Sequence, residues 1–206
     1  MTDAGASDPR LPIVLASASE RRKAILHRLG FAYTIDPADI DETPAPGASP
    51  RDVAMTLARD KARTVAARHA SGTVIGADTV VATHAGMLGK PADAAEARRF
   101  LEVLASATHE VITGLALFHV RSGRERVTAT TTRVTMRALT PAEIDAYVSS
   151  GEPFGKAGGY AIQENADRFV TRLEGSFDNV VGFPSETFLL EWEALRAELE
   201  RAGGSP

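Results

Sequence analysis

The chain has 206 residues, of which 44% are hydrophobic and 24% are charged, so it is long enough to bury the core of one globular domain. Its formal net charge of -4 argues against bulk electrostatic binding to nucleic acids or to an anionic membrane. The absence of cysteine excludes disulfides, thiolate metal sites and cysteine nucleophiles, and it is compatible with a cytoplasmic protein.

We predict a disordered tail over residues 1–10, followed by a single domain over residues 11–202. The first ten residues contain Asp3 and Asp8 and no apolar stretch, so we expect neither a signal peptide nor a transit peptide. The apolar runs of the chain, such as 111–120, are too short to cross a membrane. No internal repeat or linker divides the sequence further.

The first third of the chain predicts alternating strands and helices. Short apolar runs indicate the strands, and apolar residues at helical spacing indicate the helices. The elements expected here, in chain order, are a strand at 11–16, a helix that ends at Gly30, a strand at 31–35, a proline-rich loop at 37–50 and a helix that begins with the capping sequence Ser49–Asp52.

The middle of the chain predicts both a helix and a hairpin. The elements expected here are a buried strand Thr73–Ala77 with Asp78 at its end, an extended segment at 80–82, a helix capped by Asp93 and Glu96, and a hairpin of 111–120 with 127–139 through Ser122 and Gly123. Because a hairpin pairs antiparallel strands, we expect a mixed sheet rather than a purely parallel one.

The last third predicts two helices separated by short strands. The elements expected here are a helix capped by Thr140, strands near 160–162, 168–173 and 176–181, and an amphipathic helix over 188–199. Strands interleaved with helices over the whole length indicate an α/β fold with helices flanking one sheet.

The first candidate for chemistry is the segment Ser17–Arg22, which follows a strand and opens a helix. Ligands of α/β sheets bind at that place, and a helix N-terminus offers free N–H groups to an anion. A purely structural alternative is that Ser19 caps the helix and that Arg21 and Arg22 face the solvent. Neither this segment nor Gly151–Ala157 has the spacing of a Walker loop.

Two carboxylates and two lysines on other segments complete the set of candidates. Glu42 lies in the proline-rich loop and Asp78 follows a buried strand, while Lys61 lies within a helix and Lys90 lies in a loop. Each is unremarkable alone, since surface acids, turn aspartates and solvated lysines are common. Together they suit metal-assisted phosphoryl hydrolysis, because Mg²⁺ takes one or two carboxylates plus phosphate oxygens and the lysines neutralise the remaining charge.

The sequence resembles the Maf-type nucleotide pyrophosphatases. The segments that carry the resemblance are LASASERR, DIDE, ARDKAR, IGADTVV, LGKP, GYAIQ and GSFDNVVGFP. The resemblance implies an α/β fold with an elongated mixed β-sheet in two lobes, flanking helices and a central cleft. It also implies hydrolysis of a nucleoside triphosphate at the α-phosphate, and frequently a homodimer. The segment Tyr160–Gln163 is similar to the branch that acts on dTTP and UTP rather than on 7-methyl-GTP.

The resemblance also implies roles for individual residues. Asp78 is expected to act as the acid/base group, and Glu42 with Asp78 is expected to hold a divalent cation, Mg²⁺ or Mn²⁺. The residues expected to bind the triphosphate or its leaving pyrophosphate are Lys61, Lys90, Arg21, Arg22, Ser17, Ser19 and Thr79. Gln163 is expected to read uracil or thymine, because its amide offers one donor and one acceptor to the N3–H and the carbonyl of the base.

Two departures from the family pattern leave questions open. Glu20 stands where the family usually has proline, and Glu164 follows Gln163 where the family has glycine. The charge of the phosphate loop and the base specificity are therefore open at this point. A different reading of the same residues is a nucleotide-binding regulator of cell division without turnover, although a pure sensor has no obvious use for Asp78.

Overall fold

A computed structural model describes residues 12–203, and the predicted tail over residues 1–10 lies outside this part of the chain. The strands are β1 (Ile13–Leu15), β2 (Tyr33–Ile35), β3 (Thr73–Thr83), β4 (Gly86–Leu88), β5 (Thr108–His119), β6 (Arg124–Met136) and β7 (Val170–Glu174). The helices are α1 (Glu20–Arg28), α2 (Pro50–Ala66), α3 (Ala94–Leu104), α4 (Pro141–Ser149), α5 (Phe177–Val181) and α6 (Ser185–Gly203). Short 3₁₀ turns lie at Ala157–Gly159 and Asp167–Phe169.

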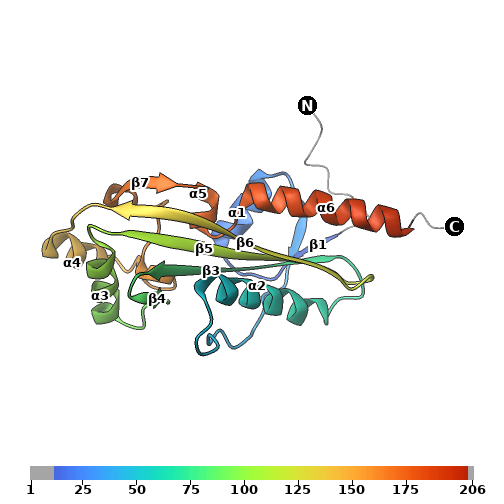
Figure 1. Cartoon of the computed structure of the whole chain (residues 1–206), viewed down its shortest axis with the longest axis horizontal. Coiled ribbons are helices and arrows are strands. Elements are labelled where there is room, and N and C mark those ends of the chain that lie inside the picture. Colours follow the sequence, from blue (N-terminus) through green and yellow to red (C-terminus); the bar gives the residue numbers. More distant parts are fainter. Residues whose placement is uncertain (1–11, 204–206) are drawn as a thin grey trace.

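The strands form one mixed sheet in the order β2-β1-β3-β5-β6-β7, and β4 pairs with β3 outside this path. β1 runs parallel to β2 and to β3, whereas the β3–β5, β5–β6 and β6–β7 pairs are antiparallel. The predicted α/β class and mixed sheet are therefore confirmed. The long strands β3, β5 and β6 give the molecule its elongated shape (Figure 1).

The two faces of the sheet are covered by different helices. α2 packs on one face, where its residues Ala58 and Ala62 join a small-residue core with Val74 of β3. α6 lies on the other face, and α3 and α4 lie at one end of the long strands (Figure 1). The main core contains an aromatic cluster in which Phe31 meets Phe188 and Trp192 edge to face.

Two glycines let α2 lie directly on the sheet. A Cβ added to Gly76 would lie 2.1 Å from the carbonyl oxygen of Ala58, and one added to Gly114 would lie 2.1 Å from that of Ala54. Side chains alternate along a strand, so Asp78 shares the face of Gly76 and points toward α2. The close packing therefore brings Asp78 near the side chains that α2 carries.

The helix starts follow the predicted caps. Ser49 accepts a hydrogen bond from the backbone N–H of Asp52 and precedes Pro50, which suits the first helical position. Thr140 and Glu143 form a complete capping box. Local sequence is thus sufficient to place the N-termini of α2 and α4.

Three predicted elements differ from the structure. β3 continues unbroken from Thr73 to Thr83, so Asp78 lies in the middle of a strand and not at its end. Residues 160–162 form no strand; they follow a 3₁₀ turn and lead into another turn. The segment 176–181 forms the short helix α5, capped by Ser176 and closed by Gly182 at a φ of 111°.

None of the helices over residues 12–203 combines the length and the apolar character that a membrane span requires.

Candidate active site

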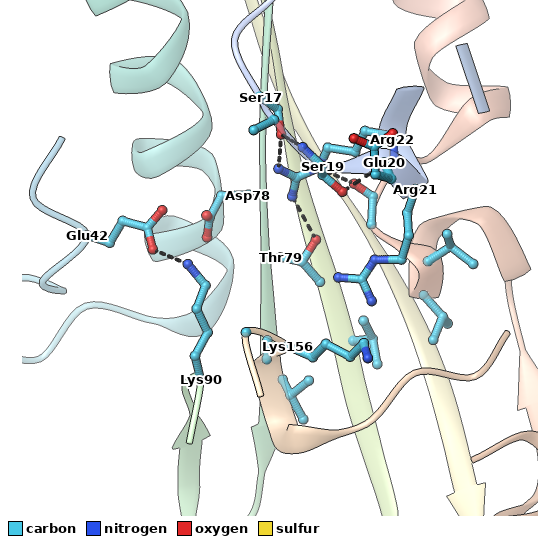
Figure 2. Close-up of a pocket in the computed structure, with 18 of the residues that line it drawn as sticks. Ser17, Ser19, Glu20, Arg21, Arg22, Glu42, Asp78, Thr79, Lys90 and Lys156 are labelled. Atoms are coloured by element: carbon cyan, nitrogen blue, oxygen red, sulfur yellow. Dashed lines mark hydrogen bonds and ion pairs between the residues drawn. The ribbon is translucent and has the colours of Figure 1, made fainter. Parts of the chain in front are cut away.

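A cavity of about 550 Å³ opens beside the carboxyl end of β1 and the middle of β3. Its walls come from the segment after β1, the proline-rich loop, α2, β3, the turn after β4, and residues 154–164 and 180–182. The predicted site residues that line the cavity are Ser17, Ser19, Arg21, Arg22, Glu42, Lys61, Asp78, Thr79 and Lys90. Segments that are distant in sequence thus meet at one place, as Figure 2 shows for most of these residues.

Four charged side chains form a row of ion pairs along one wall. Lys61 Nζ lies 2.6 Å from Asp78 Oδ1 and 2.6 Å from Glu42 Oε1. Lys90 Nζ lies 2.6 Å from Glu42 Oε2. Lys61 and Asp78 are only 7% and 8% exposed, whereas Lys90 reaches in from an exposed loop. Positive and negative groups alternate, so each buried charge has a partner.

The electrostatics of Glu42 follow from this arrangement. Partial burial acts to raise the pKa of the carboxyl group, but the hydrogen bonds from Lys61 and Lys90 outweigh it and lower the pKa to about 2. Glu42 is therefore a carboxylate at every physiological pH.

Arg22 is a partly buried cation whose hydrogen-bond partners are all neutral. Its guanidinium donates to the carbonyl oxygen of Gly182 at 2.9 Å, to Ser17 Oγ at 3.2 Å and to Thr79 Oγ1 at 3.4 Å. Burial lowers the pKa of Arg22, while the charge of Asp78 raises it. A partly buried cation held by neutral oxygens favours an anion beside it, so this part of the cavity suits a phosphate group.

A chain of hydroxyl groups extends from Arg22 into the core. Thr79 Oγ1 lies 3.0 Å from Thr113 Oγ1, and Thr113 Oγ1 donates to the carbonyl oxygen of Asn179 at 2.9 Å. The Asn179 side chain in turn donates to the carbonyl oxygen of Val111. This chain fixes the Thr79 hydroxyl group. Sequence reasoning missed Thr113 and Asn179, because their positions in a strand and in a predicted strand gave no sign of a polar partner.

The other end of the cavity carries a second group of charged residues. Figure 2 shows Arg21 and Lys156 on the side opposite Glu42 and Lys90. Glu164 forms an ion pair with Lys156 and also lines the cavity, as does Phe154. In the sequence, Lys156 lies in a segment without the spacing of a Walker loop and Glu164 departs from the family pattern, and neither feature indicates a place in this cavity.

Gln163 is the predicted site residue that does not line the cavity. It lies in the turn after Ile162 with its side chain exposed, while the next residue, Glu164, faces the cavity.

Glu42 and Asp78 are the residues suited to hold a divalent cation. Both carboxylates contact the same ammonium group, that of Lys61, so together they already share one positive charge. Residues 12–203 contain no cluster of three or more histidine or carboxylate side chains placed to hold a metal ion. Two carboxylates nevertheless fit Mg²⁺, which usually completes its coordination with water and substrate phosphate oxygens.

The geometry agrees with what comparison with known proteins finds. A family model described as Maf-like protein matches residues 12–194. A dTTP/UTP pyrophosphatase of Myxococcus xanthus (strain DK1622) is 48% identical over 192 residues, which cover 93% of this chain and 92% of that protein. One of Salinibacter ruber (strain DSM 13855 / M31) is 44% identical over 195 residues, which cover 94% and 96%.

A third relative with the same name, from Koribacter versatilis (strain Ellin345), is 45% identical over 172 residues, which cover 84% of this chain and 88% of that protein. The match extends from β1 into α6 and thus includes every segment that lines the cavity. With a family model and full-length relatives in agreement, the chain belongs to the Maf family.

Proposed function

We propose that this protein hydrolyses nucleoside triphosphates, dTTP and UTP in particular, to the monophosphate and pyrophosphate. The observation that carries the proposal is that the row Lys90–Glu42–Lys61–Asp78 and the partly buried Arg22 line one cavity. Cations on two walls suit a triphosphate, and a carboxylate between them suits the activation of water. The curated relatives at 44–48% identity carry the name of this activity.

The cations position the triphosphate and stabilise the leaving pyrophosphate. Phosphoryl transfer depends mainly on alignment and on neutralising the charge of the phosphate oxygens. Lys90 is the most accessible cation of the row, with 56% of its side chain exposed, so it can exchange Glu42 for a phosphate oxygen. The guanidinium of Arg22 and the hydroxyl group of Ser17 provide donors on the opposite wall, while Thr79, whose own hydroxyl group donates to Thr113, accepts from Arg22 and helps to fix it.

Asp78 orients and deprotonates the attacking water. Lys61 holds the Oδ1 oxygen of Asp78 at 2.6 Å and thereby fixes the orientation of the carboxylate. A fixed carboxylate beside the α-phosphate can accept the proton of the water as the new P–O bond forms.

Glu42 and Asp78 are the residues that would hold a divalent cation, Mg²⁺ or Mn²⁺. When bound, such an ion adds positive charge for the transition state and favours ionisation of a water molecule. The two carboxylates supply the protein ligands, and Lys61 keeps them close together.

Gln163 remains our sequence-based prediction for recognition of uracil or thymine. It is adjacent in the chain to Glu164, which lines the cavity, so the turn that carries both residues lies near the site.

Three further features extend the proposal. The cavity corresponds to the cleft between two lobes that the family resemblance implies. A homodimer is expected on the same basis, and sedimentation equilibrium of the purified protein tests it. The cytoplasm is the expected location, since nucleoside triphosphates are made and consumed there.

The test is pyrophosphate release from a panel of UTP, dTTP, CTP, GTP and 7-methyl-GTP, with Mg²⁺ or Mn²⁺. We expect release from UTP and dTTP above the other substrates, and loss of release on chelation of the metal. Binding of nucleotides without pyrophosphate release would instead support a sensor and would reject the hydrolase. A preference for 7-methyl-GTP would reject the assigned substrates.

A further inference from the structure

The end of the cavity away from the ion-pair row carries a cation and a carboxylate that the proposed hydrolysis does not use. Lys156 Nζ forms an ion pair with Glu164 Oε2 at 2.9 Å and donates to the carbonyl oxygen of Glu152 at 2.6 Å. Lys156 and Glu164 both line the cavity. The Lys156 side chain is 15% exposed and that of Glu164 is 36% exposed, so the carboxylate is the more accessible of the two.

A carboxylate in this position does not suit a phosphate. Glu164 would repel a triphosphate, and its partner Lys156 lies on the side of the cavity opposite Glu42 and Lys90 (Figure 2). Its charge also reaches the neighbouring Arg21, since Glu164 raises the pKa of that guanidinium while burial, the larger effect, lowers it. The location fits an uncharged part of the ligand that presents a hydrogen-bond donor.

The surroundings of the pair suit a planar ring. Phe154, two positions before Lys156 in the chain, also lines the cavity and is 41% exposed. An exposed aromatic face beside charged hydrogen-bonding groups provides a surface on which a base can stack. The apolar side chains of Val81, Val111 and Val180 line the cavity as well.

We propose that Lys156 and Glu164 form a base-recognition pair, in which Glu164 accepts the N3–H of uracil or thymine and Lys156 donates to the O4 carbonyl oxygen, so that only the O2 carbonyl oxygen is left for the amide of Gln163. The inference rests on the proposed function and identifies the base end of its site. It assigns a role to Glu164, which was noted in sequence only as a departure from the family pattern.

Cytosine provides the size-matched competitor. In the same pose, its N3 lone pair would face the Glu164 carboxylate and its amino group would face the Lys156 ammonium, and both contacts are repulsive. The pair therefore discriminates between UTP and CTP by charge and hydrogen bonding rather than by size.

Two variants test the pair. Glu164→Gln keeps the shape of the side chain, but its amide can turn either a donor or an acceptor toward N3, so we expect the ratio of kcat/KM for UTP over CTP to fall at least tenfold. Lys156→Met keeps an unbranched apolar stem and should raise the KM for UTP with little change in kcat. Lys156→Arg, which retains the charge, should restore most of the UTP affinity.

The control is Glu174→Gln on β7, which makes the same change in an ion pair with Arg172 that lies outside the cavity. This variant should keep the wild-type ratio of kcat/KM for UTP over CTP. Gln163→Leu changes the neighbouring residue, so the ratio of kcat/KM for UTP over CTP in this variant distinguishes an effect of Gln163 from an effect of Glu164. Thermal unfolding of each variant excludes loss of the fold.

Inorganic tripolyphosphate, a triphosphate without a base, distinguishes base contacts from phosphate contacts. Its inhibition constant should be unchanged in Glu164→Gln and in Lys156→Met if both residues contact the base. A weaker inhibition in Lys156→Met, or an unchanged ratio of UTP over CTP in Glu164→Gln, overturns the inference.

Binding of UMP and CMP, measured by calorimetry, needs no turnover. A wild-type preference for UMP that Glu164→Gln loses would support base recognition even if the protein released no pyrophosphate. If the wild-type protein releases pyrophosphate but binds UMP no better than CMP, the base-recognition pair is rejected and the proposed function stands.

Discussion

Lys61 shows how strongly the chemistry of one side chain depends on its partners. It is 7% exposed and lies between the carboxylates of Glu42 and Asp78. A buried charge without a partner is costly, so Lys61 and Asp78 stabilise each other in the folded state. The same contact fixes the orientation of the Asp78 carboxylate, which the proposed role of Asp78 as base requires.

Asp78→Asn should lower kcat by about 10²- to 10⁴-fold and leave the fold intact. The amide keeps the shape of the carboxylate but cannot accept a proton from water, and Glu42 still pairs with Lys61. Pyrophosphate release measures the loss, and calorimetry should show that the variant still binds nucleotide. Near-normal release by the purified variant would contradict the role of Asp78 as base.

Lys90→Ala and Lys61→Ala should each weaken transition-state stabilisation by ~2–4 kcal/mol, as measured by kcat/KM. Their effects on folding should differ. Lys90 is exposed, so its loss should leave the free energy of unfolding nearly unchanged, whereas loss of Lys61 leaves Asp78 buried without its partner and should cost about 3 kcal/mol.

Urea unfolding of both lysine variants checks the difference, with Arg172→Ala as an exposed control outside the cavity. Wild-type kcat/KM for either lysine variant would show that the residue has no part in catalysis. Equal stability of Lys61→Ala and Lys90→Ala would show that Asp78 does not need its buried partner.

Among the elements, the position of α2 depends on the two glycines beneath it. Gly114→Ala would place a methyl group against the backbone of Ala54, and the helix would have to move. We expect destabilisation by about 1–3 kcal/mol. We also expect a lower kcat, because α2 carries Lys61. Gly89→Ala, where an added Cβ meets no atom within 4 Å, is the control for stability. An unchanged melting temperature for Gly114→Ala would rule out the close packing.

Local sequence predicts the elements whose signals are local. The caps at Ser49, Asp93 and Thr140 mark the starts of three helices correctly. The turn at Ser122 and Gly123 predicts the hairpin of β5 and β6. Each of these signals lies within a few residues of the feature that it predicts.

Elements that depend on distant partners were predicted less well. The apolar run before Asp78 indicated the end of a strand, but β3 continues because Lys61 and Thr113 provide partners for its polar residues. Val180 and Val181 favour a strand, but Ser176 caps the helix α5 instead. The backbone N–H of Ser176 and the side chain of Asn179 both donate to Thr132 Oγ1 of β6, which anchors this helix to the sheet.

The site shows the same division. Motifs select the segment Ser17–Arg22 and the residues of the charged row, all of which contribute to the lining of the cavity, but they give no reason to select Lys156. Its importance depends on an ion pair with Glu164 and on a shared cavity, neither of which has a signal in sequence spacing.

At the scale of the whole molecule, the mixed topology explains where the cavity lies. The parallel pairing of β1 and β3 brings the end of β1, with the segment Ser17–Arg22 that follows it, beside β3. The antiparallel strand β5 then lies on the other side of β3, with Gly114 opposite Asp78. The cavity forms where the parallel and antiparallel parts of the sheet share β3, so its two walls come from different parts of the chain.

Stability of the whole molecule should depend on pH through His109, which is buried on β5. Its Nε2 atom lies 2.7 Å from the hydroxyl oxygen of Tyr160, and its Nδ1 atom has no hydrogen-bond partner among the residues that the structure describes. Burial lowers the pKa of His109 from 6.5 to about 4. The folded protein therefore keeps this imidazole neutral at a pH where the unfolded chain already binds a proton.

The sign of the effect follows from proton linkage. Between about pH 6.5 and 4 the unfolded state binds more protons at this position, so the free energy of unfolding should fall as the pH falls, by at most about 3 kcal/mol. Glu42, with a pKa of about 2, contributes a similar loss only below about pH 4.5.

Urea unfolding at a series of pH values measures the slope of the free energy of unfolding against pH. His109→Phe should flatten it between pH 6.5 and 4.5, leaving the part due to His119, whose pKa burial also lowers. The slope rather than the absolute stability is the readout, because the variant also leaves Tyr160 without its partner. A slope in His109→Phe equal to that of the wild type would show that this histidine is not the source.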